Sequence, residues 1–191
     1  MKLVYVEGQD YLTCNMWERH GYGITEDVDE ADIVCFTGGA DVSPLLYFEK
    51  NTTSYCDRDT DLLSTALYSR VSWRNDVLLV GICRGGQFLN VMQGGSMRQH
   101  VDGHGEWDGH YLNGPDGPVH VRSDHHQAMV SNKALSPRVY ISTDEEEVEE
   151  IVVYVEQEVL CFQPHPEYTP AGSDTEDLFF DLVEEFFYVG D

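Results

Sequence analysis

The chain has 191 residues, of which 35 are acidic and 11 are lysine or arginine, so its formal net charge at pH 7 is −24. Such a negative protein repels nucleic-acid phosphates and anionic lipid head groups, which argues against nucleic acid or a membrane surface as its partner. Hydrophobic residues make up 41% of the chain, enough to build a core, and the length predicts a single domain over residues 1–191.

Apolar segments and helical spacing alternate along the first half of the chain. In order, they predict a strand at 3–6, a helix at 11–20, a strand at 33–36, a helix at 61–74, a strand at 77–80 and a helix at 87–93. In the helix at 61–74 the apolar positions include Leu62 and Leu63, which are therefore expected to face the core. The unbroken apolar run at 77–80 is typical of a central parallel strand.

The second half begins with a loop and ends with a helix. Residues 99–117 are rich in glycine, histidine and aspartate and indicate a loop, after which strands are predicted at 119–122, 151–155 and 159–162. A last amphipathic helix begins near Ser173, which has Glu176 at capping-box spacing. The alternation of strands and helices predicts an open, mostly parallel α/β sheet with helices on both faces.

The strand at 77–80 leads into a glycine, one residue, a cysteine, one residue and a glycine. Gly81, Cys83 and Gly85 have the spacing of a nucleophile elbow, a sharp turn that raises a nucleophile above the end of a strand. The N-terminus of the next helix would favour a thiolate, and the backbone N–H of Arg84 could stabilise an oxyanion. By itself the pattern fits a buried structural cysteine equally well.

A second motif follows the strand at 159–162. Gln163-Pro164-His165-Pro166-Glu167 offers an imidazole that could accept the thiol proton and a carboxylate that could orient the ring. Together with Cys83, these residues predict a cysteine nucleophile with its base, and they make the structural interpretation of the cysteine much less favourable.

These two motifs together resemble the class I glutamine amidotransferase superfamily. The branch with the greatest similarity is that of the γ-glutamyl hydrolases (peptidase C26, γ-glutamyl-γ-aminobutyrate hydrolase-like). Three further segments are similar to that branch and occur in the same order: the glycine-rich stretch 37–44 with Tyr47, the pair Arg58-Asp59, and the histidine-pair segment 123–128.

The resemblance implies a flavodoxin-like fold and a Cys83–His165–Glu167 triad that hydrolyses a γ-glutamyl amide through a thioester. It implies an oxyanion hole at Gly39 and Arg84 and requires no cofactor. The substrate's glutamyl group would be held by the following residues: Gln87, Asp124, His125, His126 and Gln127.

Two positions depart from the pattern of that branch. Its members usually carry a residue larger than Gly86 after Cys-Arg-Gly and a tryptophan in place of Pro164. We expect both changes to alter the rim of the pocket, so the leaving group of the substrate stays open.

The loop at 99–117 raises the question of a metal site. His100, His104 and His110 occur among acidic residues at 102, 106 and 108, but the interspersed glycines make a helical ligand pair improbable. The sequence therefore predicts a loop beside the pocket and no metal. His125 and His126 could act as alternative bases, although they fit the substrate-binding segment better.

Two other functions remain open. A glutaminase subunit could hand ammonia to a separate synthetase, with docking on the C-terminal part of the chain, where segment 144–191 carries 16 acidic side chains and no lysine or arginine. A catalytically inactive binding module could use the same surface, although a solvated acidic face is the simpler interpretation. Homo-oligomers are a further alternative.

The cysteines indicate a reducing compartment. The five are widely spaced without a CxxC pair, which predicts neither a disulfide framework nor a zinc motif. The short apolar start does not fit a secretion signal, and no apolar run reaches the length of a membrane span. We therefore expect a cytoplasmic protein with free thiols.

Overall fold

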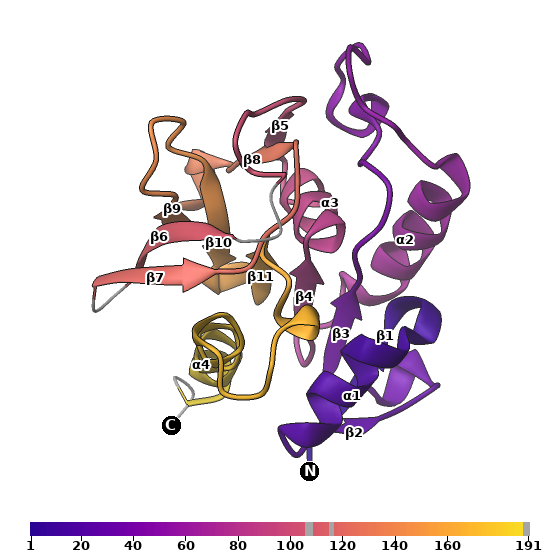
Figure 1. The fold of residues 1–191 in the computed structure, drawn as a ribbon. Coiled ribbons are helices and arrows are strands. Elements are labelled where there is room, and N and C mark those ends of the chain that lie inside the picture. The colour runs from indigo at the N-terminus through magenta and orange to yellow at the C-terminus, as the bar shows by residue number, and fades with distance from the viewer. Residues whose placement is uncertain (106–108, 115–116, 189–191) are drawn as a thin grey trace.

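A computed structural model describes residues 1–105, 109–114 and 117–188. The fold is built on one nine-stranded sheet and a separate two-stranded hairpin (Figure 1). The sheet strands are β1 (Leu3–Val6), β2 (Gly23–Ile24), β3 (Ile33–Phe36), β4 (Leu78–Ile82), β5 (Ser96–Arg98), β8 (Ala128–Val130), β9 (Arg138–Ile141), β10 (Glu149–Tyr154) and β11 (Val159–Phe162). The hairpin consists of β6 (His110–Gly114) and β7 (Gly117–Val121).

The sheet has a parallel half and an antiparallel half. Its order is β2-β1-β3-β4-β11-β10-β8-β5, with β9 also paired to β10. The strands from β2 to β11 in this order run parallel, whereas β10, β8, β5 and β9 pair antiparallel. The predicted α/β fold with its parallel central strands is confirmed, and β4 lies between β3 and β11.

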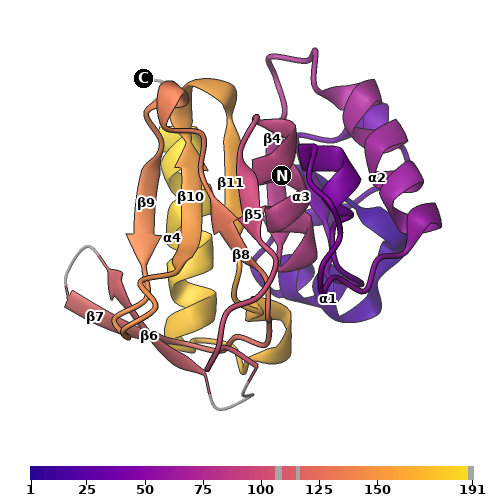
Figure 2. The same cartoon turned by 90° about the horizontal axis from the view of Figure 1, so that it is seen from above.

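Four α-helices pack on the two faces of the sheet. They are α1 (Tyr11–Arg19), α2 (Arg58–Val71), α3 (Arg84–Met92) and α4 (Asp174–Tyr188). Trp17 of α1 and Phe179 of α4 belong to one core cluster, whereas Val71 of α2 and Phe88 of α3 belong to the cluster on the opposite face. Figure 2 shows α4 running along the sheet beside β10 and β11. This arrangement confirms the prediction of helices on both faces.

Short 3-10 turns complete the described secondary structure, at 7–9, 28–30, 44–47, 133–135, 155–157 and 166–168. Helix α4 begins as the capping-box spacing predicts, because Ser173 Oγ accepts the N–H of Glu176 at 3.3 Å. Among the described residues, no helix is both long and apolar enough to cross a bilayer.

The apolar face predicted for α2 was wrong in its first turns, although Val71 at the end of the helix is buried. Leu62 and Leu63 are 56% and 68% exposed, whereas Asp61 and Ser64 are buried. The inner face of this helix is polar because it receives the guanidinium of Arg84, which donates to Asp61 Oδ1 at 2.8 Å and to Ser64 Oγ at 2.7 Å. A buried arginine that needs hydrogen-bond partners thus outweighs the helix's own hydrophobic pattern.

Candidate active site

Cys83 lies between β4 and α3 with φ 50° and ψ −111°, a conformation that is strained for any residue other than glycine. The neighbouring backbone passes so close that side chains cannot fit at the flanking glycines. A Cβ at Gly81 would lie 2.3 Å from the carbonyl oxygen of Gly85, and one at Gly85 would lie 2.1 Å from that of Phe36. The turn has the geometry of a nucleophile elbow and places Cys83 at the N-terminus of α3.

His165 and Glu167 follow β11, the strand that pairs with β4. The N–H of His165 donates to the carbonyl of Arg122 at 2.8 Å, which fixes the backbone at this point. The Nδ1 of His165 lies 2.7 Å from Oε1 of Glu167, and both side chains are buried. Glu167 belongs to the single 3-10 turn Pro166–Tyr168, so the spacing of two residues brings the carboxylate back to the ring.

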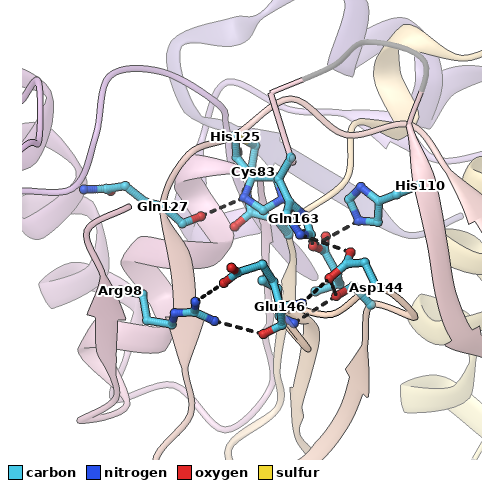
Figure 3. Close-up of polar contacts among 12 residues, drawn as sticks. Cys83, Arg98, His110, His125, Gln127, Asp144, Glu146 and Gln163 are labelled. Atoms are coloured by element: carbon cyan, nitrogen blue, oxygen red, sulfur yellow. Dashed lines mark hydrogen bonds and ion pairs between the residues drawn. The ribbon is translucent and has the colours of Figure 1, made fainter. Parts of the chain in front are cut away.

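The His165 ring contacts Cys83. Burial disfavours the charged ring, but the Cys83 sulfur and the Glu167 carboxylate outweigh it and raise the pKa of His165 to about 10. The loop after β3 runs past both side chains, since a Cβ at Gly38 would lie 3.5 Å from Cε1 of His165 and 4.0 Å from Cβ of Cys83. Gln163 Nε2 also lies 3.5 Å from the sulfur (Figure 3). These contacts place the imidazole where it can accept the thiol proton of Cys83.

Alkylation tests this contact. With iodoacetamide at pH 6, His165→Ala should slow the reaction of Cys83 about 10-fold or more, because the variant lacks the imidazole that can accept the thiol proton. Burial and neighbouring acidic groups raise the pKa of both Cys14 and Cys56, and the substitution should leave the rates of these two cysteines unchanged. Peptide mapping by mass spectrometry gives the three rates. An unchanged rate at Cys83 would contradict the assignment of His165 as its base.

A cavity of about 250 Å³ opens beside the sulfur. It contains most of the residues predicted from the sequence and is lined by Gly39, Asp41, Cys83, Arg84, Gln87, Gly105, Asp124, His125, His126 and Gln127. His165 and Glu167 lie behind the sulfur and are not part of this lining. The structure therefore brings the predicted nucleophile, oxyanion residues and substrate-binding residues to one place.

The two predicted oxyanion residues are neighbours. A Cβ at Gly39 would lie 3.5 Å from Cδ of Arg84. Arg84 is the first residue of α3, so its N–H has no acceptor within its own helix and is free to face the cavity. Its guanidinium points the other way, toward Asp61 and Ser64. Arg84 can thus serve the site through its backbone while its side chain anchors α2.

The walls of the cavity are held by a polar network. Gln87 Nε2 donates to Gln163 Oε1 at 3.0 Å and to the carbonyl of Gln127 at 3.3 Å. His126 Nε2 lies 2.9 Å from Oδ2 of Asp41, and Nδ1 of His125 lies 2.7 Å from the carbonyl of Gln127. Both histidines are therefore engaged with groups other than Cys83, which does not favour them as alternative bases.

Sequence reasoning missed three residues of the site. Asp41 and Gly105 line the cavity, and Gln163 joins the sulfur to Gln87. Asp41 lies in the glycine-rich stretch, and Gln163 lies two residues before His165. Their closeness in the sequence to the motifs was the signal that could have identified them. The histidines of the histidine-rich loop occupy different environments. His100 faces Asp102 at the surface, His104 is buried and His110 is half-buried. Glu106 and Asp108 are outside the described residues.

The expected effect of Gly86 on the pocket rim was wrong. A Cβ at this position would lie 2.9 Å from the backbone nitrogen of Phe162 in β11, so Gly86 allows α3 to approach the sheet rather than shaping the rim. Pro164 is buried as well. Neither residue lines the cavity.

Residues 17–116 match the family Peptidase C26, and the chain belongs to that family. The family match and the fold together place the chain in the class I glutamine amidotransferase superfamily. This match includes Cys83 and ends before His165.

Two solved structures and one relative illustrate the similarity. A chain of PurLQS from Thermotoga maritima superposes with a TM-score of 0.68 at 16% identity, covering 96% of this chain and 98% of that chain. A glutamine amidotransferase from Thermotoga maritima gives a TM-score of 0.61 at 15% identity, covering 98% and 86%. Protein NtpR of Enterococcus hirae is 29% identical over 187 residues, covering 83% of this chain and 77% of NtpR.

Proposed function

We propose that the protein hydrolyses a γ-glutamyl amide bond, with Cys83 as nucleophile, His165 as acid and base, and Glu167 as the group that orients His165. One observation carries the proposal. The 2.7 Å contact between Nδ1 of His165 and Glu167 lies directly behind a cysteine that is raised on an elbow and opens onto a cavity.

The chemistry follows from these positions. The thiolate of Cys83 attacks the side-chain carbonyl carbon of the substrate, and the backbone N–H groups of Gly39 and Arg84 stabilise the oxyanion that forms. His165 donates its proton to the departing amine as the C–N bond breaks, which leaves a γ-glutamyl thioester. His165 then takes a proton from water, whose oxygen attacks the thioester and releases glutamate and the thiolate.

Two carboxylates in the cavity indicate a substrate with a cationic group. Asp41 and Asp124 line the cavity, and Arg84 is the sole lysine or arginine among its described lining residues. The guanidinium of Arg84 is bound to α2, and Oδ2 of Asp41 already contacts His126, so Asp124 and Oδ1 of Asp41 are the groups that would attract an α-ammonium group such as that of a glutamyl unit. The small cavity suits one such unit, with the leaving amine toward solvent.

The assay uses the purified protein with γ-glutamyl anilide, a set of γ-glutamylated amines and glutamine. Release of glutamate is expected, together with a protein mass increased by one γ-glutamyl group when the reaction is quenched early. Peptide mapping should place that group on Cys83. A folded protein that releases no glutamate from any of these compounds would contradict the proposal and favour the inactive binding module.

A glutaminase that feeds ammonia to a synthetase is the second candidate. The segment beside the cavity exposes Leu45, Phe48 and Tyr55, which are 78%, 98% and 83% accessible, and Ser54 of the same segment contacts Gln127 at 2.5 Å. Such an apolar rim is suited to a partner. The name of NtpR states no activity, so this relative does not decide between the two functions.

The leaving group separates the two candidates. A hydrolase should accept γ-glutamyl amides with bulky amines, whereas a glutaminase subunit should act on glutamine alone, slowly, and only gain activity with its synthetase. In the first case Phe48→Ser leaves kcat/KM unchanged. In the second case the same substitution removes the activation by the partner.

A further inference from the structure

Four side chains converge on one buried point beside the cavity. Glu150 of β10 and His104, from the loop between β5 and β6, are almost fully buried, as is His125, which precedes β8. Oε1 of Glu150 lies 3.1 Å from Nδ1 of His104, 3.0 Å from Nε2 of His110 and 3.2 Å from Nε2 of His125. In Figure 3, His110, His125 and Asp144 lie around this region, close to Gln163.

Hydrogen bonds do not account for this convergence. Both carboxylate oxygens of Glu150 and the facing ring nitrogens of all three histidines are buried, and none meets hydrogen-bond geometry. His125 shows the problem most clearly. Its Nδ1 lies 2.7 Å from the carbonyl of Gln127, which requires the proton on that nitrogen. In the neutral ring the lone pair of Nε2 then faces the carboxylate, and this contact is repulsive unless a cation lies between the two.

The outer contacts are those of metal-bound histidines. A histidine that binds a metal through one nitrogen usually donates the other N–H to a carboxylate or a backbone carbonyl. His125 has the carbonyl of Gln127 in this position, so its ring is oriented from behind with Nε2 toward Glu150. Nε2 of His104 lies 3.2 Å from Oδ2 of Asp144, within ion-pair distance but outside hydrogen-bond geometry.

We propose that these residues bind one Zn²⁺ ion. The ligands are Nδ1 of His104, Nε2 of His110, Nε2 of His125 and the carboxylate of Glu150. The ligand atoms of these four residues all lie within 4.8 Å of one another. Three imidazoles and one carboxylate form a complete set for tetrahedral zinc, and imidazole-rich sites disfavour Mg²⁺ and Ca²⁺. With four protein ligands the site is closed, so its role is structural rather than catalytic.

The ion would stabilise one wall of the active-site cavity. His125 lines that cavity, and Gly105 follows His104 directly, so the metal would tie both sides of the wall to β10. Glu150 also reaches the site through its backbone, because its carbonyl accepts the N–H of Gln163 at 2.8 Å. Loss of the metal should therefore loosen substrate binding and raise KM more than it lowers kcat.

Metal binding is tested on the full chain after treatment with a chelator. Titration with Zn²⁺ should show one equivalent bound per chain and a higher Tm, and Co²⁺ in its place should give the intense visible absorption of tetrahedral coordination. Mg²⁺ at the same concentration should change neither signal. These readouts do not depend on activity, so they stand apart from the proposed hydrolysis.

Two variants and one control locate the site. His110→Ala removes a ligand and should weaken Zn²⁺ binding by about 100-fold or more, whereas Asp144→Asn removes an outer contact and should weaken it by about 10-fold. His100→Ala is the matched control, because His100 belongs to the same loop but faces solvent. If His110→Ala does not fold, the Zn²⁺ affinity of Asp144→Asn tests the site in its place. Equal Zn²⁺ binding by Asp144→Asn, His100→Ala and the native chain, or no binding by the native chain, would overturn the proposal. The three histidines would then bind Glu150 through shared protons and without a metal.

Discussion

Replacing Cys83 by serine is expected to lower kcat/KM for γ-glutamyl hydrolysis by about 10⁴-fold or more, since removal of a nucleophile leaves only the contributions of binding and the oxyanion hole. The hydroxyl is a far poorer nucleophile than the thiolate next to His165. Glutamate release from γ-glutamyl anilide measures the effect. The early-quench mass increase should disappear in the same variant.

The pKa of His165 gives a second readout of this variant. The sulfur of Cys83 helps to raise that pKa to about 10, against the opposing effect of burial. The serine variant should therefore have a lower His165 pKa, measured by NMR titration of the ring. Cys14→Ser is the control, because Cys14 lies on α1 outside the cavity, and it should change neither activity nor pKa. Full activity of Cys83→Ser would disprove the assignment of the nucleophile.

Replacing Asp61 by alanine is expected to lower the free energy of unfolding by about 3–5 kcal/mol, because it leaves the buried guanidinium of Arg84 without its counter-charge. Arg84 is 1% exposed and Asp61 is 6% exposed, so water cannot replace the lost carboxylate. Urea denaturation followed by circular dichroism measures the change.

Two further variants define the cause. Asp59→Ala, in the first turn of the same helix, should cost no more than about 0.3–1 kcal/mol, the usual size of a helix-dipole contribution. The double variant Asp61→Leu with Arg84→Met should recover much of the loss, since it removes both charges. If Asp61→Ala and Asp59→Ala unfold at the same urea concentration, the ion pair does not anchor α2.

The elbow could be predicted because its determinants are local. Gly81 and Gly85 are required by backbone contacts within a few residues and with the adjacent strand, and the spacing of His165 and Glu167 is that of a single turn. The parallel strands β1, β3, β4 and β11 could be predicted for a similar reason, because their residues are mostly apolar on both faces, whereas the two-residue strand β2 is too short to show a pattern. These features depend on short segments, and the pattern of each segment contains the information.

The parts of the fold and of the site that could not be predicted depend on contacts between segments that are distant in the sequence. The inner face of α2 is polar where Ser64 and Asp61 bind the guanidinium of Arg84. Arg84 lies 20 residues or more away from them in the sequence, so the local pattern of α2 does not reveal this contact. The cluster around Glu150 combines three histidines from separate segments, whereas sequence reasoning grouped His104 and His110 with exposed His100. The antiparallel strands β5, β8 and β9 are three or four residues long, too short for a clear alternating pattern.

The close packing of the elbow has a consequence for protein engineering. No side chain fits at Gly81 or Gly85, so variation at these positions would unfold the turn before it changed the substrate. By contrast, Tyr55 is exposed, and its N–H donates to Asp41, which lines the cavity. A library confined to residues 51–55 should therefore alter the leaving amine of the proposed hydrolysis while the reacting groups stay in place.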